Sequence, residues 1–296
     1  MANAGVIEKT VICDRSTFHA GGRVGFLLIH GLGGTPVELR FVAQGLARAG
    51  NTVYCCQLAG HCGTGPDLRD STWEEWYRSV EEAHDRLRQH CDVVIVGGLS
   101  MGAILALHLA AQRPTQVQGL ALFAPTLKLD GWAMPWHIHI LHMIRPAKFK
   151  LDIYLAERAP YGIKDDRIRN FIINSMQSGD SSEAGVFSTP AHSFAHFNRL
   201  VSIVKRELKS IDTPALILHP RNDDIASLDN SLYLQRKLAG MVEMVVLDDS
   251  YHIITLDRQR HVVVERTAAF AESIGRRNGL GQGQQRPGRP VRTRGE

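Results

Sequence analysis

The chain has 296 residues, of which 44% are hydrophobic, and a formal net charge of +4. Such a chain is long enough for one large α/β domain or two small ones with a sizeable core. Residues 276–296 hold six arginines and one glutamate, a net of +5, so the rest of the chain carries about −1 and does not suggest a nucleic-acid-binding surface.

Cysteine usage and the N-terminal sequence bear on the compartment. The five cysteines include no C-x-x-C pair, so they indicate neither a disulfide framework nor a zinc knuckle, and free thiols fit a reducing compartment. Residues 1–10 lack the basic and apolar regions of a signal peptide. Residues 93–111 are uncharged, but their β-branched start and central glycines argue against a membrane helix. We therefore expect a soluble, cytoplasmic protein without stable membrane insertion.

Apolar runs typical of strands alternate with helix-like segments as far as residue 125. Residues 57–70 are expected to form a loop within this alternation. The whole pattern predicts a parallel sheet covered by helices on both faces. Strands are expected at residues 6–13, 24–29, 52–56, 93–96 and 117–124, and helices at 36–49, 71–89 and from 103 onward.

The alternation stops at Pro125 and returns near residue 210. We interpret residues 126–209, with their short helical patterns, as a cap inserted over the carboxyl edge of the sheet; ordinary connecting helices are the alternative. Residues 1–125 and 210–275 then form the core, with further strands at 215–219 and 242–247 and helices at 229–238 and 257–274. The glycine-, arginine- and proline-rich residues 276–296 predict a disordered basic tail, and weak contact with anionic surfaces is the alternative role.

A G-x-S-x-G pattern at residues 98–102 lies between a β-branched run and an alanine- and leucine-rich segment. Strand, sharp turn and helix are the context of a nucleophile elbow, in which the serine hydroxyl stands clear of the sheet. Gly98 and Gly102 are expected there because side chains would collide as the strand and helix fold back on each other. Ser100 is therefore the candidate nucleophile.

A serine nucleophile needs a base to take its proton, and an acid to orient that base. In the chain order expected after an elbow serine, an acid and then a histidine follow later strands. Asp223 and Asp224 follow the strand at 215–219, and His252 follows the strand at 242–247. Asp223 is the favoured acid and Asp224 the alternative, while Asp248 and Asp249 are expected only to cap the loop before His252.

A glycine-rich turn at residues 30–36 follows the buried strand at 24–29. Such a turn exposes backbone N–H groups, which can hold an anion or the oxyanion of an acyl-transfer reaction.

A family resemblance rests on four segments, at residues 27–34, 98–102, 221–223 and 250–257. Together they resemble the small bacterial carboxylesterases and monoacylglycerol lipases of the α/β-hydrolase fold, over about residues 20–125 and 210–274. The resemblance implies a mostly parallel central sheet with helices on both faces and an inserted cap, although residues 126–209 match only loosely and the tail does not match.

The resemblance also implies roles for single residues. The acid of that family aligns with Asp223, and its oxyanion-hole N–H groups come from the positions of Leu32 and Met101. No metal or organic cofactor is implied. Tyr251 stands where the family usually has glycine, and Cys62 ends what is usually a Gly-His-Gly loop. Both departures bear on substrate preference more than on mechanism.

Three histidines at residues 137, 139 and 142 are similar to a metallo-hydrolase ligand pattern. Leu141 replaces its aspartate, and a metal site needs further ligands placed by their own context. Packing among the neighbouring tryptophan and isoleucine side chains is the favoured interpretation, so no metal site is expected.

The expected function is hydrolysis of short- to medium-chain acyl esters or monoacylglycerols, with the small-molecule ester as the binding partner. The apolar residues of the expected cap suggest an apolar acyl chain. A lactone, a thioester or a polyester oligomer is the alternative substrate, because fold and triad do not fix the substrate. A non-catalytic binding protein is a further alternative, against which the three intact triad positions argue. The oligomeric state does not follow from the sequence.

Overall fold

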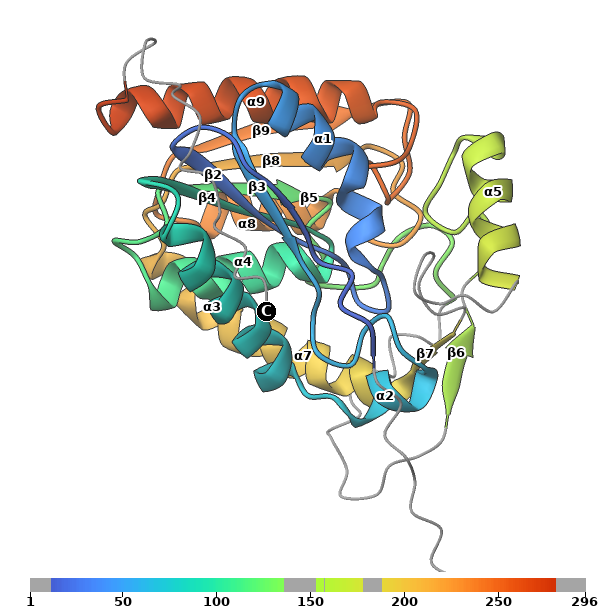
Figure 1. Ribbon diagram of the computed structural model, residues 1–296. Helices are drawn as coiled ribbons and strands as arrows, with labels where there is room; N and C mark the ends of the chain where they lie inside the picture. Colours follow the sequence, from blue (N-terminus) through green and yellow to red (C-terminus); the bar gives the residue numbers. More distant parts are fainter. Residues whose placement is uncertain (1–11, 136–152, 157, 178–187, 281–296) are drawn as a thin grey trace, which may run out of the picture.

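The computed structural model describes residues 12–135, 153–156, 158–177 and 188–280 of the chain. Its centre is a seven-stranded sheet in the order β1-β3-β2-β4-β5-β8-β9 (Figure 1). Neighbouring strands are parallel except β1, which pairs antiparallel with β3. The strands are β1 Thr17–His19, β2 Val24–Ile29, β3 Thr52–Cys56, β4 Val93–Leu99, β5 Gly119–Phe123, β8 Ala215–Pro220 and β9 Val242–Leu247.

Helices cover both faces of this sheet. α1 and α9 pack together on one face, and α3, α4, α7 and α8 lie on the other (Figure 1). The central strands β4 and β5 are buried along their whole lengths between these layers, as expected for a parallel sheet of apolar strands. The prediction of a mostly parallel α/β sheet is confirmed. The helices are η1 Pro36–Leu39, α1 Arg40–Arg48, α2 Gly65–Asp70, α3 Trp73–Arg88, α4 Met101–Gln112, α5 Asp166–Gln177, α7 Ala191–Glu207, η3 Leu208–Ser210, α8 Asp229–Lys237 and α9 Arg260–Arg277.

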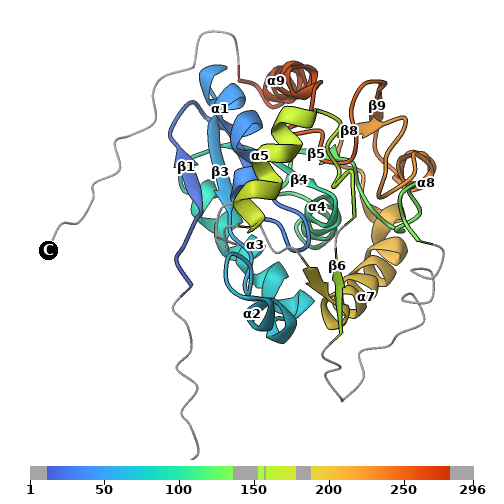
Figure 2. The same ribbon diagram turned by 90° about the vertical axis from the view of Figure 1, so that its right-hand side faces the viewer.

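The chain between β5 and β8 contributes a separate two-stranded sheet, β6 (Tyr154–Ala156) with β7 (Ser188–Pro190), together with α5 and α7. β6 and α5 lie beside the ends of the central strands (Figure 2). α7 instead packs against α3 and α4, because its apolar residues share one face and meet the buried side of α4. The last part of the expected cap therefore lies in the helical layer of the core.

One local prediction is wrong. Residues 65–70 lie in the stretch expected to be a loop, yet they form the helix α2. Thr64 accepts the N–H of Asp67 and the Asp67 carboxylate accepts the N–H of Thr64, a reciprocal capping box that begins the helix. The expected first strand at 6–13 lies almost wholly outside the described residues, as does the expected tail beyond residue 280. Within the described chain, no helix has the length and apolarity needed to cross a membrane.

Candidate active site

Ser100 occupies the turn between β4 and α4. Its backbone has φ 56° and ψ −113°, a strained conformation for a residue with a side chain. A Cβ added at Gly98 would come within 2.4 Å of the carbonyl carbon of Gly102, and one added at Gly102 would come within 2.1 Å of the Ile29 oxygen. The G-x-S-x-G glycines thus allow the close strand–helix approach that holds the serine at the tip of the turn.

Asp223 and His252 come together from loops that follow β8 and β9. The His252 Nδ1 lies 2.8 Å from Asp223 Oδ2 and 3.0 Å from Oδ1. Asp223 Oδ1 also accepts the backbone N–H groups of Ile225 and Ala226, which fix the carboxylate in place. Both side chains are buried. The carboxylate therefore orients the imidazole and favours a proton on its Nδ1.

Buried charges around His252 set its protonation. Burial by itself lowers the pKa of His252, but the carboxylates of Asp223, Asp224 and Glu38 outweigh it and raise that pKa above the ordinary value near 6.5. Burial opposes the ionisation of Asp223, yet the charge and hydrogen bond of His252, the charge of His219 and the N–H of Ala226 hold the pKa of Asp223 below its ordinary value. The histidine is thus a strengthened base.

Asp224, the alternative acid, contacts the backbone and not the imidazole. Its Oδ1 accepts the N–H of His252 at 3.2 Å and its Oδ2 accepts the N–H of Gly162 at 2.8 Å. Asp248 and Asp249 point outward and form exposed ion pairs with arginine or lysine side chains. Of the four aspartates considered from the sequence, Asp223 is the one whose carboxylate meets the imidazole.

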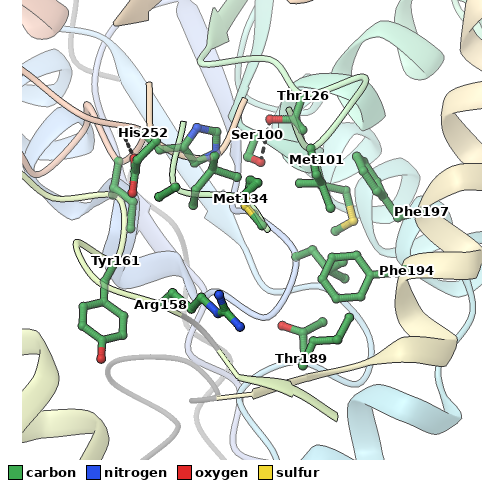
Figure 3. Close-up of a pocket in the computed structure, with 18 of the residues that line it drawn as sticks. Ser100, Met101, Thr126, Met134, Arg158, Tyr161, Thr189, Phe194, Phe197 and His252 are labelled. Atoms are coloured by element: carbon green, nitrogen blue, oxygen red, sulfur yellow. Dashed lines mark hydrogen bonds between the residues drawn. The ribbon is translucent and has the colours of Figure 1, made fainter. Parts of the chain in front are cut away.

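Ser100 and His252 are close but not hydrogen-bonded to each other. The Ser100 hydroxyl donates to the Thr126 Oγ1 at 3.1 Å, as Figure 3 shows. The His252 Nε2 is buried and has no partner among the described residues. Both residues line the same cavity, and hydrogen bonds at catalytic sites commonly tighten only when substrate binds.

The two expected N–H donors flank the serine. Met101 is the first residue of α4, where backbone N–H groups have no acceptor within the helix. Leu32 belongs to the glycine-rich turn after β2 and lines the same cavity as Ser100 and Met101. Both residues therefore border the cavity at the serine.

A cavity of about 300 Å³ opens over these groups. Figure 3 shows Phe194 and Phe197 of α7 on one side of it and His252 on the opposite side, with Ser100 between them. Most of its wall is apolar, which suits an acyl chain. Its apolar side chains include Leu32, Met101, Met134, Leu155, Phe194 and Phe197.

Glu38 is a cavity residue that the sequence did not single out. Its Oε2 accepts the Gly31 N–H at 3.2 Å, and its carboxyl occupies the space above Gly34. Burial raises the pKa of Glu38 to about 7, although the Gly31 N–H and the charge of His252 act in the opposite direction. Thr35-x-x-Glu38 is a capping-box pattern in the sequence, but the carboxyl turns back to the glycine turn and thereby braces the expected oxyanion site.

The three histidines at residues 137, 139 and 142 lie outside the described residues. Within the described ranges, no cluster of three or more His, Cys, Asp or Glu side chains is placed to hold a metal ion. Tyr251, one of the two departures from the family pattern, lies with its ring 5.5 Å from that of Trp132 at the edge of the site.

Known proteins are similar to this chain in both sequence and fold. Residues 23–259 match the family described as serine aminopeptidase, S33. The chain is 31% identical to the thermostable monoacylglycerol lipase of Bacillus sp. strain H-257 over 266 residues, which cover 89% of this chain and 96% of that protein.

Two solved structures illustrate the likeness of the fold. One belongs to a study of the metagenome-derived lipolytic enzymes LipS and LipT, with a TM-score of 0.75, 27% identity, and coverage of 87% of this chain and 97% of that one. The other is a soluble variant of monoglyceride lipase from Saccharomyces cerevisiae, with a TM-score of 0.75, 17% identity, and coverage of 93% and 99%. The chain belongs to the serine aminopeptidase S33 family and is a hydrolase of the lipase and esterase type with the α/β-hydrolase fold.

Proposed function

We propose that this protein hydrolyses carboxylic esters of short- to medium-chain acyl groups, monoacylglycerols among them, through Ser100, His252 and Asp223. The observation that carries the proposal is the Asp223–His252 hydrogen bond of 2.8 Å beside a serine held in a strained elbow. A buried, oriented imidazole beside a partly buried hydroxyl that lines the cavity is the arrangement that makes serine a nucleophile.

The reaction runs in two halves. The Ser100 hydroxyl leaves Thr126 and gives its proton to His252 Nε2 as the oxygen attacks the ester carbonyl. The tetrahedral intermediate then expels the alcohol oxygen, which takes that proton from His252, and an acyl-enzyme remains. Water attacks the acyl carbon with His252 again as the base, and collapse returns the proton to Ser100 and releases the acid.

The backbone N–H groups of Leu32 and Met101 bind the carbonyl oxygen as it gains charge. Loss of one such donor typically costs about 2.7–4 kcal/mol of transition-state stabilisation. Because the donors are backbone groups, the side chains of these residues can vary without loss of the hole. Glu38 supports the site by holding the Gly31 N–H and hence the turn that carries Leu32.

The cavity and the relative both support this substrate class. The apolar wall fits a hydrocarbon chain, and the relative that is 31% identical is named a monoacylglycerol lipase. We propose that the expected cap, residues 126–209, supplies the acyl-binding wall, since Met134, Leu155 and Phe194 come from it. In the same proposal, the turn and loops that follow the core strands carry the reacting residues Ser100, Asp223 and His252.

Hydrolysis of p-nitrophenyl esters from two to sixteen carbons tests the proposal. We expect wild type to be active, Ser100→Ala to lose at least about 10⁴-fold of kcat, and EDTA to change nothing. Equal activity of Ser100→Ala and wild type contradicts the serine mechanism. If the wild type is inactive on every ester but active on a lactone, a thioester or a polyester oligomer, the same triad acts on that alternative substrate.

A further inference from the structure

The backbone around His252 is tied to the segment 162–165, which lies between β6 and α5. Three consecutive N–H groups make these ties. Tyr251 donates to Asp257 Oδ2 at 2.7 Å, His252 donates to Asp224 Oδ1 at 3.2 Å, and Ile253 donates to the Gly162 oxygen at 2.7 Å. The third bond reaches the segment directly, and the two carboxylates reach it through their remaining hydrogen bonds.

The Asp224 carboxylate bonds both to the backbone of His252 and to the segment 162–165. While its Oδ1 takes the His252 N–H, its Oδ2 takes the Gly162 N–H at 2.8 Å. Asp224 is only 1% exposed, so water does not replace either bond. Burial raises the pKa of Asp224, and His252 and the two N–H groups act against that rise.

Asp257 does the same from the loop before α9. It is fully buried, and it takes the N–H of Lys164 at 2.9 Å and of Asp165 at 2.9 Å as well as that of Tyr251. Asp165 in turn caps α5, because its own carboxylate accepts the Arg167 and Ile168 N–H groups. Asp257 thus connects the start of α5 to the residue before His252.

Gly162 lies directly against the histidine. A Cβ added there would come within 3.3 Å of the His252 Cβ and 2.8 Å of the Ile253 Cγ1, and the backbone φ of Gly162 is +71°. Both the close approach and the left-handed backbone favour glycine. The segment therefore packs on the histidine as well as bonding to its backbone.

We propose that Asp224 and Asp257 are positioning residues that form a carboxylate clamp, which places His252 only while the segment 162–165 is seated against it. This inference rests on the proposed function of His252 as the base. In it Asp223 orients the imidazole ring, and the carboxylate clamp fixes the backbone that carries the ring. The residues between β5 and β8 then act on the chemistry as well as on substrate binding.

Asp257→Asn and Asp224→Asn test the clamp. An amide is the same size as a carboxylate, but only its oxygen accepts hydrogen bonds, so its NH2 group faces at least one backbone N–H and that hydrogen bond is lost. We expect kcat to fall about 10- to 100-fold, since a small displacement of a catalytic group has that effect. The loss should be equal for p-nitrophenyl acetate and decanoate, because the base serves both. Assays are run where thermal melting shows each variant folded.

Asp249→Asn is the matched control. Asp249 lies in the same loop and also reaches the segment, through an ion pair with Lys164 at 2.7 Å, but its side chain is half-exposed. Exposed pairs contribute little, so we expect less than a twofold change in kcat. A loss confined to the KM of decanoate in the clamp variants would mean that the segment only lines the acyl site, and would overturn the proposal.

Two readouts separate the clamp from a general structural role. Asp224→Asn removes a charge that faces His252 together with Asp223 and Glu38, so the acid limb of kcat/KM should move to lower pH; Asp257→Asn should leave it in place. Hydrogen exchange in Asp257→Asn should rise in peptides covering both 160–168 and 249–256. If exchange rises in only one of the two peptides, the clamp is refuted, whether or not the wild-type protein hydrolyses esters. If the wild-type protein is inactive on esters, that result refutes only the proposed function.

Discussion

The seven-stranded core and the chain between β5 and β8 differ in how deeply their side chains are buried and in the length of their strands. The core buries its central strands and most of α4 in a mostly apolar interior, so the loops at the strand ends have rigid supports. The segment has strands of only three residues, and Phe171 of α5 is 70% exposed. The reacting groups therefore stand on the more buried part, while the less buried part shapes the cavity and, in the proposal above, seats the backbone of His252.

Asp223→Asn is the core change with the largest expected effect. The amide cannot stabilise the imidazolium and favours the wrong tautomer, so we expect kcat to fall about 10⁴-fold. The fall should be the same for acetate and decanoate esters, because the core serves every substrate alike. A loss that depended on chain length would break the division between the two regions.

Phe194→Ala is the matching change on the other side of the cavity. Phe194 points into the cavity from α7 (Figure 3), and removing its ring takes apolar contact from a long acyl chain. We expect kcat/KM for p-nitrophenyl decanoate to fall about tenfold and that for acetate to stay within about threefold. Equal losses for both esters would show that Phe194 supports the catalytic groups themselves.

Glu38→Gln has the smallest expected effect. It tests whether the charge of Glu38 contributes to the raised pKa of His252. The base must be neutral to act, and because the pKa of His252 is raised, the acid limb of kcat/KM should lie above pH 6.5. Glu38, whose pKa is about 7, adds negative charge facing His252 as pH rises. Its removal lowers the pKa of His252, so the limb should move to lower pH. A pH–rate profile that does not move contradicts this coupling.

The core was predictable because its signals are local. Four β-branched residues before a G-x-S-x-G pattern identify β4 and its elbow, and the positions of Asp223 and His252 follow from their places after later strands. The choice between Asp223 and Asp224 is not local, since both carboxylates reach His252 and only the fold decides which one meets the ring.

The roles of Glu38 and Asp257 were not predictable for a related reason. Glu38 sits in a capping pattern whose carboxyl turns elsewhere, and Asp257 bonds to residues more than ninety positions away. The Asp257 pairing depends on how the chain between β5 and β8 returns to the sheet. No spacing in the sequence reports that path.

The most direct test of the account is labelling with a fluorophosphonate, followed by intact mass and peptide mapping. The probe loses fluoride and bonds to a serine oxygen only where a base activates the hydroxyl. We predict one adduct per chain, on Ser100, none in Ser100→Ala, and labelling slowed at least about a hundredfold in Asp223→Asn. Folded wild-type protein that takes no label, or Ser100→Ala labelled as fast as wild type, would contradict the assignment of Ser100 as the activated nucleophile.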